Sequence, residues 1–162
     1  MDTKAFREGF RDGIPIGLGY LAVSFSLGIS AKQAGLTPLQ GFVTSFLENA
    51  SAGEYIAFTL IGAGATYIEL CLMTIIANAR YLLMSCAMSQ RFSPDTPMIH
   101  RFFVAFDLTD ELFGIAIGRP GYLNPYYSYG AFLVALPGWS IGTVLANPPP
   151  VSSPAICCRA IW

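Results

Sequence analysis

The residues of this sequence best suited to binding or proton transfer are carboxylates that lie inside apolar stretches. Six of the ten acidic residues lie in such stretches: Glu48, Glu54, Glu69, Asp107, Asp110 and Glu111. An Asp at the centre of a membrane helix costs roughly 2.5 to 3.5 kcal/mol on insertion scales, so its presence there needs a reason. The set indicates a substrate or proton pathway. The alternative is that some of these residues lie at helix ends, where the cost is small.

Residues 48–54 combine two carboxylates with small or helix-weakening residues in the middle of an apolar region. Unwound backbone at membrane depth is tolerated where it is buried in protein or lines a cavity, and a half-helix N-terminus there can bind an anionic group. We therefore predict a broken helix that binds substrate. The residues expected to do so are Glu48, Asn49, Ser51, Gly53 and Glu54. The alternative is an ordinary loop between two short re-entrant segments.

A second acidic group, Asp107, Asp110 and Glu111, recurs at helical spacing within residues 99–118. Three carboxylates this close cannot all stay ionised at low cost, so at least one is expected to be protonated or paired with a cation. We expect these residues to carry a coupling proton, with Asp110 or Glu111 the favoured carrier.

Glycines continue the acidic stripe through Gly114 and Gly118, a small-xxx-small spacing that permits close helix approach. This predicts that the stripe packs inside the bundle. The residues expected to face lipid instead include Phe106, Phe113 and Ile117. The same glycine spacing recurs at 13 and 17 and at 138 and 142, which makes it a weak signal alone.

Arg80 is the cation best placed to meet the acidic group, because its surroundings are otherwise apolar. It is too far along the chain from Glu69 for a direct pair on one helix, about 16 Å at the rise of an α-helix. Two alternatives remain: Arg80 pairs with Asp110 and Glu111 and joins the substrate site, or it snorkels to the interface.

Other chemistries find little support. The single histidine, His100, stands beside Arg101 at the start of a span with no nucleophile motif, so an intramembrane enzyme is only a remote alternative. The four cysteines form neither a disulfide framework nor a metal site, and we expect no cofactor. A formal net charge of -1 without basic runs argues against nucleic acid as a partner.

Composition indicates the elements that must position these groups. With 54% hydrophobic and 12% charged residues and a mean hydropathy of +0.53, the chain belongs to the membrane class. We predict an all-α, polytopic membrane protein with lipid as a partner and about five crossing or re-entrant segments. Their ranges are 13–31, 40–64, 65–90, 99–118 and 126–146. Three basic residues before the first segment and one after it favour a cytoplasmic N-terminus. No internal repeat is evident.

Four short motifs in order give the chain a resemblance to the AzlC family, the larger membrane subunit of branched-chain amino acid exporters. They are Phe-Arg-Glu-Gly-Phe at 6–10 with Gly-Ile-Pro at 13–15, Ser-Ala-Gly-Glu at 51–54, Asn-Ala-Arg-Tyr at 78–81 and Leu-Thr-Asp-Glu at 108–111. The resemblance implies a multi-pass permease of the inner (plasma) membrane. It would export valine-like amino acids with a small AzlD-type membrane subunit, driven by an ion gradient. The sequence has no G-x-x-x-x-G-K-[ST] phosphate loop for binding ATP, which agrees with an ion gradient as the energy source.

Two features depart from the family pattern. Glu54 stands where the resemblance implies Gln or another neutral polar residue. The family also continues with further spans where this chain turns to three prolines, so it reads as C-terminally truncated. We expect a permease domain over 1–147 and a Pro-rich unstructured or aberrant tail over 148–162. This makes a non-transporting or defective membrane assembly subunit the main alternative function.

Overall fold

The computed structural model describes residues 2–148, and this part of the chain is helical without strands. Its helices are α1 (Thr3–Gln33), α2 (Pro38–Glu48), α3 (Ser51–Gly62), α4 (Tyr67–Ala77), α5 (Arg80–Ser89), α6 (Met98–Phe106), α7 (Asp110–Ile117) and α8 (Pro125–Ala146). The expected all-α membrane fold is therefore confirmed. Residues 149–162, where an aberrant tail was expected, lie outside the described residues.

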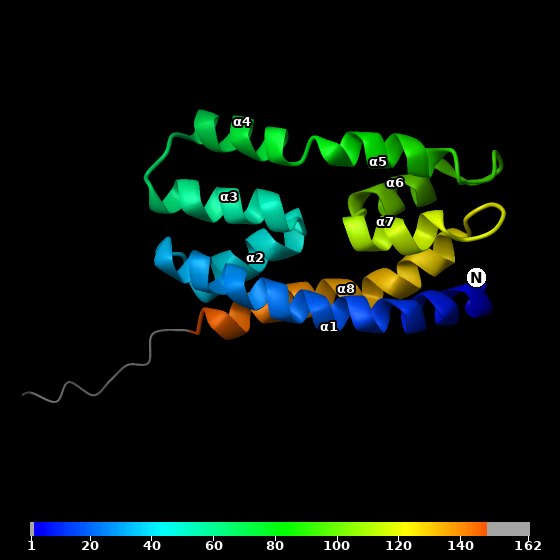
Figure 1. Cartoon of the computed structure of the whole chain (residues 1–162), viewed down its shortest axis with the longest axis horizontal. Helices are drawn as coiled ribbons and strands as arrows, with labels where there is room; N and C mark the ends of the chain where they lie inside the picture. The colour runs from blue at the N-terminus through cyan, green and yellow to red at the C-terminus, as the bar shows by residue number, and fades with distance from the viewer. Residues whose placement is uncertain (1, 149–162) are drawn as a thin grey trace, which may run out of the picture.

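Two helices, α1 and α8, are long and apolar enough to cross a membrane alone. Together α4 and α5 pass the same criteria as a third span, bent by 46° at a short break. The remaining four helices form two hairpins. In Figure 1, α2 runs inward from the end where α1 finishes and α3 returns to that end, whereas α6 and α7 enter and leave at the opposite end. With the bent pair counted as one span, three candidate spans and two hairpins correspond to the five expected segments.

The order of these elements repeats with inverted direction, although the sequence shows no repeat. A span, α1, precedes the hairpin α2–α3; a second span, α4–α5, runs the other way and precedes the hairpin α6–α7. Inverted repeats of this kind are common in secondary transporters, where the substrate site lies between the two halves. The two hairpin tips accordingly approach each other near mid-length of the bundle (Figure 1).

Glycines join α1 to α8, which lie side by side and run in the same direction (Figure 1). A Cβ on Gly13 would lie 2.8 Å from the Cα of Ala131, and one on Gly17 would lie 2.9 Å from the backbone oxygen of Val134. The close approach therefore requires glycine at these positions. Small residues pack membrane helices together in this way, and both recurrences of the spacing, at 13 and 17 and at 138 and 142, lie at this interface.

The prediction that Gly114 and Gly118 pack against other helices is wrong. A Cβ on Gly114 would meet nothing within 4 Å, and Gly118 is the C-cap of α7. The stripe was inferred for one continuous helix, but the chain breaks between Phe106 and Asp110, so residues before and after the break no longer share a face. Phe106 is 51% exposed, as expected, while Phe113 and Ile117 are half-buried.

Local sequence explains the helix starts. Thr37 and Gln40 form a capping box at α2, with Pro38 at the first helical position, and Thr66 and Glu69 form a second one at α4. Glu69 is thus a capping residue at an exposed helix end. For this carboxylate the helix-end alternative is correct.

Candidate functional site

Three helix breaks meet between the hairpins and the bent span. The C-cap residues at these breaks are Asn49 after α2, Asn78 after α4 and Asp107 after α6. The side-chain amide of Asn49 donates to Asp107 at 3.3 Å, and that of Asn78 donates to Glu48 at 3.4 Å. Asn49 adopts a left-handed backbone with φ 44°, which asparagine tolerates better than most residues. The chain leaves the helix within residues 48–54 as predicted, but it does so in the form of the alternative, a loop between two short re-entrant helices, and not as a break in one crossing helix.

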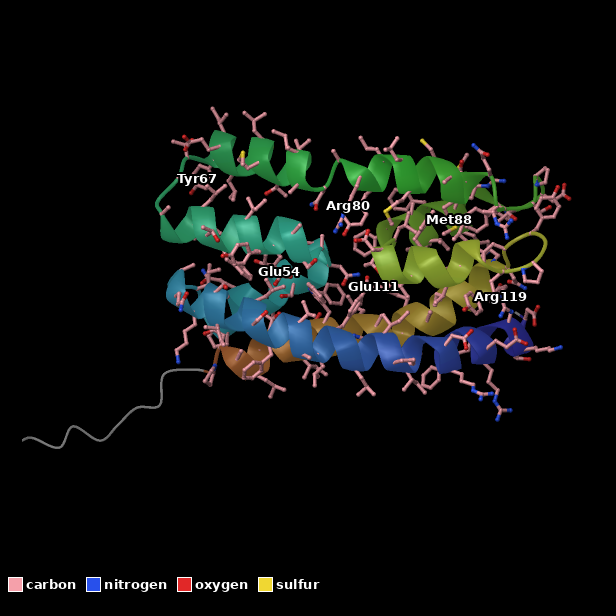
Figure 2. All side chains as sticks on the ribbon, viewed as in Figure 1. Glu54, Tyr67, Arg80, Met88, Glu111 and Arg119 are labelled. Carbon is pink, nitrogen blue, oxygen red and sulfur yellow. The ribbon has the colours of Figure 1, made fainter. Side chains whose placement is uncertain are left out.

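A polar cavity of about 150 Å³ lies at this junction. Its lining comes from both hairpin tips, the start of α5 and the middles of α1 and α8: Tyr20, Val23, Asn49, Ser51, Arg80, Tyr81, Thr109, Asp110, Glu111 and Trp139. Ligand pockets for drug-sized molecules measure about 300 to 1,000 Å³, so this cavity suits a small molecule. Figure 2 shows Arg80 and Glu111 at mid-length, between Tyr67 at one end and Arg119 at the other.

Arg80 pairs with Asp110 across the cavity at 2.7 Å. This decides between the two alternatives for Arg80: it joins the acidic group. The guanidinium also lies 5.2 Å from the ring centre of Tyr81. The side chains of Arg80 and Asp110 remain 45% and 44% exposed, so both charges stay accessible from the cavity.

Three aromatic residues of the cavity were not predicted: Tyr81 at the start of α5, and Tyr20 and Trp139 on the two long helices. The hydroxyl of Tyr20 lies 2.7 Å from Glu111 and 2.5 Å from the hydroxyl of Thr109, which ties α1 to the tip of the second hairpin. The ring of Trp139 packs edge-on against Tyr20 with centres 5.1 Å apart. Both sit in the middle of apolar helices, where an aromatic residue gives no sign in the sequence of which side it faces.

The two helices that start at the hairpin tips, α3 and α7, have different N-termini; α5, which also starts at the cavity, has no side-chain cap. No side chain caps α3, whose N-cap is Ala50, so the backbone N–H groups of its first turn lack that partner. Helix α7 is capped by Thr109, and its first turn carries Asp110 and Glu111. The first turn of α3 also contains an acidic residue, Glu54, but its side chain is buried away from the cavity. The free N–H groups of α3 are therefore suited to an anion, whereas the N-terminus of α7 already has two carboxylates at the cavity.

Four of the expected site residues do not line the cavity. Glu54 is fully buried behind it, where Ser45 and the indole N–H of Trp139 donate to its carboxylate. Asp107 is buried and accepts from Asn49. Glu48 and Gly53 contact Asn78, and a Cβ on Gly53 would lie 2.6 Å from the Asn78 amide nitrogen. These residues support the cavity from outside.

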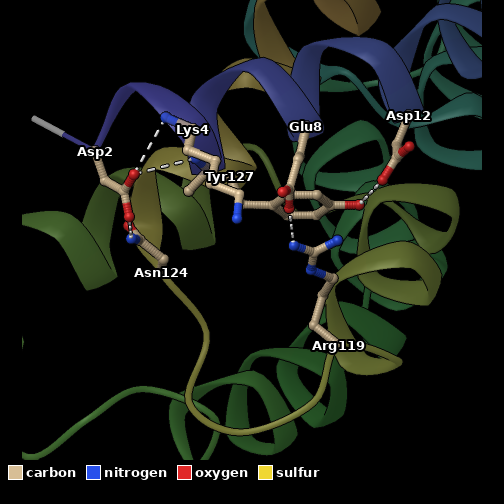
Figure 3. A network of polar contacts seen from close by, with 8 residues as sticks. Asp2, Lys4, Glu8, Asp12, Arg119, Asn124 and Tyr127 are labelled. Carbon is tan, nitrogen blue, oxygen red and sulfur yellow. Dashed lines mark hydrogen bonds and ion pairs between the residues drawn. The ribbon is translucent and has the colours of Figure 1, made fainter.

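A separate polar network closes the end of the bundle at which α1 begins (Figure 3). Arg119 donates to Glu8 and lies 4.4 Å from the ring centre of Tyr127, whose hydroxyl donates to Asp12 at 2.8 Å. The hydrogen bond to Glu8 raises the pKa of Arg119. The network fixes the loop after the second hairpin to α1.

A larger cavity of about 340 Å³ lies between α5 and α6 and is lined mainly by apolar residues such as Met88, Phe92 and Phe102. It offers few partners for a charged ligand. The smaller cavity, with its acids, arginine and free helix N-terminus, is the better candidate.

Comparisons with known proteins agree with a membrane function. The chain matches the AzlC protein family over residues 15–147. It is 27% identical over 147 residues to the inner membrane protein YgaZ of Escherichia coli (strain K12), covering 88% of this chain and 60% of that protein. It is 25% identical over 111 residues to the branched-chain amino acid transport protein AzlC of Bacillus subtilis (strain 168), covering 68% of this chain and 43% of that protein. The chain thus spans about three fifths or less of these relatives. No solved structure matches it.

Proposed function

Because this chain belongs to the AzlC family of membrane proteins, we propose that it is a permease subunit that exports branched-chain, valine-like amino acids. The observation that supports this most is the cavity between the hairpin tips, which offers partners for both ends of a zwitterion. An ion gradient drives export, and a small AzlD-type membrane protein completes the transporter.

The substrate carboxylate lies at the tip of the first hairpin in this proposal. It accepts from the uncapped N-terminus of α3, at Ser51, and from Arg80. Arg80 then shares its two-pronged guanidinium between the substrate and Asp110, since a guanidinium carries five donors in a fixed plane.

The substrate ammonium lies at the second tip, between Asp110 and Glu111. The side-chain oxygen of Asn49 is buried without a hydrogen-bond partner and lies at the same junction, so it is available as a further acceptor. An aliphatic side chain packs against the aromatic wall formed by Tyr20 and Trp139. The cavity supplies one partner for each end of the molecule.

Coupling follows from competition at the same carboxylates. A proton that binds Asp110 or Glu111 removes the charge that holds the ammonium, so proton entry releases substrate. Asp107, buried beside these residues, remains a third candidate for this role.

Binding of three matched molecules to the purified chain in lipid nanodiscs tests the site. Isobutylamine lacks the carboxylate of valine, and isovalerate lacks the ammonium. A charge-assisted hydrogen bond contributes about 1.5–3 kcal/mol, so each analogue is expected to bind roughly 10- to 100-fold more weakly than valine. Analogues that bind as tightly as valine would contradict a zwitterion site.

Transport by reconstituted vesicles, with and without the small partner, tests the function itself. We expect valine movement that depends on the partner and on a pH gradient. If Asp110→Asn and Glu111→Gln each left export unchanged at every pH, the coupling role would be withdrawn. Valine binding without transport in the presence of the partner would favour the non-transporting assembly subunit.

A further inference from the structure

Glu54 is a fully buried carboxylate, and both of its hydrogen-bond partners are neutral. It is 0% exposed, accepts from Ser45 and accepts from the indole N–H of Trp139 at 2.8 Å. Among the described residues the ion pairs are Arg80–Asp110 and Arg119–Glu8, so no cation compensates Glu54. An ionised carboxylate buried without a cation costs several kcal/mol, and a proton removes that cost.

The hydroxyl groups behind Glu54 form a chain that fits both states of the carboxyl. Ser45 contacts Glu54 on one side and lies 2.8 Å from the hydroxyl of Thr143 on the other. A serine hydroxyl has one proton, so it donates in one direction at a time. When Glu54 is ionised, Thr143 donates to Ser45 and Ser45 donates to Glu54.

The protonated state reverses every bond in this chain. Glu54 then donates to Ser45, Ser45 donates to Thr143, and Thr143 donates to a backbone oxygen, that of Ser24 or of Trp139, each 3.4 Å away. The heavy atoms stay in place, and Trp139 donates to the other carboxyl oxygen in both states. The site therefore holds or releases a proton with all these groups satisfied, as a buried polar network requires.

The groups that face Glu54 come from three helices. Ser45 and Glu48 lie on α2, Ser24 and Tyr20 on α1, and Trp139 and Thr143 on α8, with Glu54 itself on α3. Of these, Glu48 and Tyr20 are titratable. The spacing of 2.8 Å between the two hydroxyls is that of a hydrogen bond, so a proton fits between these oxygens and a metal ion does not.

We propose that Glu54, Ser45 and Thr143 form a proton-binding site, occluded from the cavity by Trp139, which transmits its occupancy to the amino-acid site. Trp139 donates to Glu54 with its indole nitrogen, and its ring lines the cavity and packs against Tyr20. Loss of the proton strengthens the bond to the indole and thereby changes the wall against which the substrate lies. The coupling role rests on the proposed function, whereas proton binding does not.

Spectroscopy on the purified chain in lipid nanodiscs tests proton binding without any substrate. Trp139 and Trp162 are the two tryptophans, so the Trp162→Phe chain reports Trp139 fluorescence alone. We expect a pH titration of this fluorescence, together with an infrared band of a protonated carboxyl group that disappears over the same pH range.

Both signals should be lost in Glu54→Gln, which keeps the hydrogen bonds to Ser45 and Trp139 and so retains the fold. Glu69→Gln is the matched control, since it replaces an exposed capping carboxylate with the residue that caps α2 in the same way. Ser45→Ala should keep the titration but shift its midpoint. A fluorescence titration that persists in Glu54→Gln, or a response to sodium at constant pH, would overturn the proposal.

Transport separates this proposal from the proposed function. Glu54→Gln should retain valine exchange across vesicles but reduce the accumulation driven by a pH gradient, since a proton at Asp110 or Glu111 still competes with the substrate ammonium. Undiminished accumulation overturns the coupling role. If valine fails to bind the unmodified chain while the two spectroscopic signals depend on Glu54, the proposed function fails and the proton site stands.

Discussion

The two re-entrant hairpins occupy equivalent places in the inverted arrangement but present opposite chemistry. The first, α2–α3, hides its carboxylate Glu54 completely and leaves the N-terminus of α3 without a cap. The second, α6–α7, caps α7 through Thr109 and places Asp110 and Glu111 at the cavity. One tip offers N–H donors and the other offers carboxylates.

This difference shows how a nearly symmetric scaffold makes an oriented site. If both tips carried uncapped N-termini, the cavity would suit a dianion; if both carried acids, it would suit a diamine. Because the tips differ, the cavity has a positive and a negative side, and Arg80 lies between them. A zwitterion fits this arrangement in one orientation.

Removing Arg80 should have the largest effect on this comparison. We expect Arg80→Ala to weaken valine binding on the order of 100-fold, because the substrate carboxylate loses a charged donor and Asp110 loses its partner. Isobutylamine, which has no carboxylate, should lose much less affinity. Isothermal titration of both ligands provides the measurement, with Arg80→Lys as the control that keeps the charge. Equal losses for the two ligands would show that Arg80 acts only through Asp110.

Replacing a glycine with alanine should change the stability of the protein in opposite directions in the two hairpins. Gly53→Ala places a methyl group against Asn78 and Glu48, so we expect a loss of about 1–3 kcal/mol from overpacking. Gly114→Ala, inside α7 with nothing within 4 Å, should instead gain roughly 0.5–1 kcal/mol from helix propensity. Thermal unfolding in one detergent measures both. Similar shifts of the melting temperature in the same direction would mean that the tips are packed alike.

The bare N-terminus of α3 can be tested by removing one backbone donor. Ser51→Pro should fold, because proline is tolerated at the first helical position and Ala50 before it is extended, with φ −138° and ψ 108°. Losing this N–H should lower valine affinity by about 10-fold. Ser51→Ala, which keeps the N–H, is the control in the same binding assay. Comparable loss in both variants would assign the effect to the hydroxyl group.

The smallest effect is expected at one of the two contacts that anchor the hairpins, the ion pair between Glu8 and Arg119. Glu8→Gln removes the exposed ion pair to Arg119 behind the second hairpin and should cost at most about 1 kcal/mol, and less at high salt. Asn147→Ala removes a buried donor to the backbone oxygen of Leu36, before the first hairpin, and should cost more, about 1–3 kcal/mol. Thermal unfolding at two salt concentrations distinguishes the two anchors. If Glu8→Gln lost more stability than Asn147→Ala, or lost the same amount at both salt concentrations, the expected ranking of the two anchors would be wrong.

The break within the first hairpin could be predicted from the sequence, although a hairpin was only the alternative interpretation, and the break within the second could not be predicted. Residues 48–54 combine small, polar and helix-weakening residues. Such residues interrupt a helix through their local preferences, whatever the tertiary structure around them. The second break has neither glycine nor proline. The signal that could have located it is Thr109 followed by two acids, a typical helix start. The sequence favours a stripe on one helix instead, because three carboxylates at helical spacing fit that pattern equally well.

The cavity could be predicted only in part. The charged and tip residues Asn49, Ser51, Arg80, Asp110 and Glu111 line it as expected. Tyr20 and Trp139 come from helices at opposite ends of the sequence, and their positions depend on how closely α1 and α8 approach. That approach is decided by glycines whose spacing recurs elsewhere in the chain, so the sequence alone does not identify the pair that meets.

The common level of the three helix breaks has a mechanical consequence. A continuous helix carries a bending load from one leaflet of the membrane to the other, whereas a helix interrupted halfway carries almost none. In the described chain only α1 and α8 run unbroken past this level, and they are pressed together along their glycines. The pair α1–α8 therefore resists bending, whereas the interrupted helices beside it bend easily at their breaks. A change in bilayer thickness or lateral pressure in one leaflet would therefore tilt the half-helices of that leaflet and leave those of the other in place.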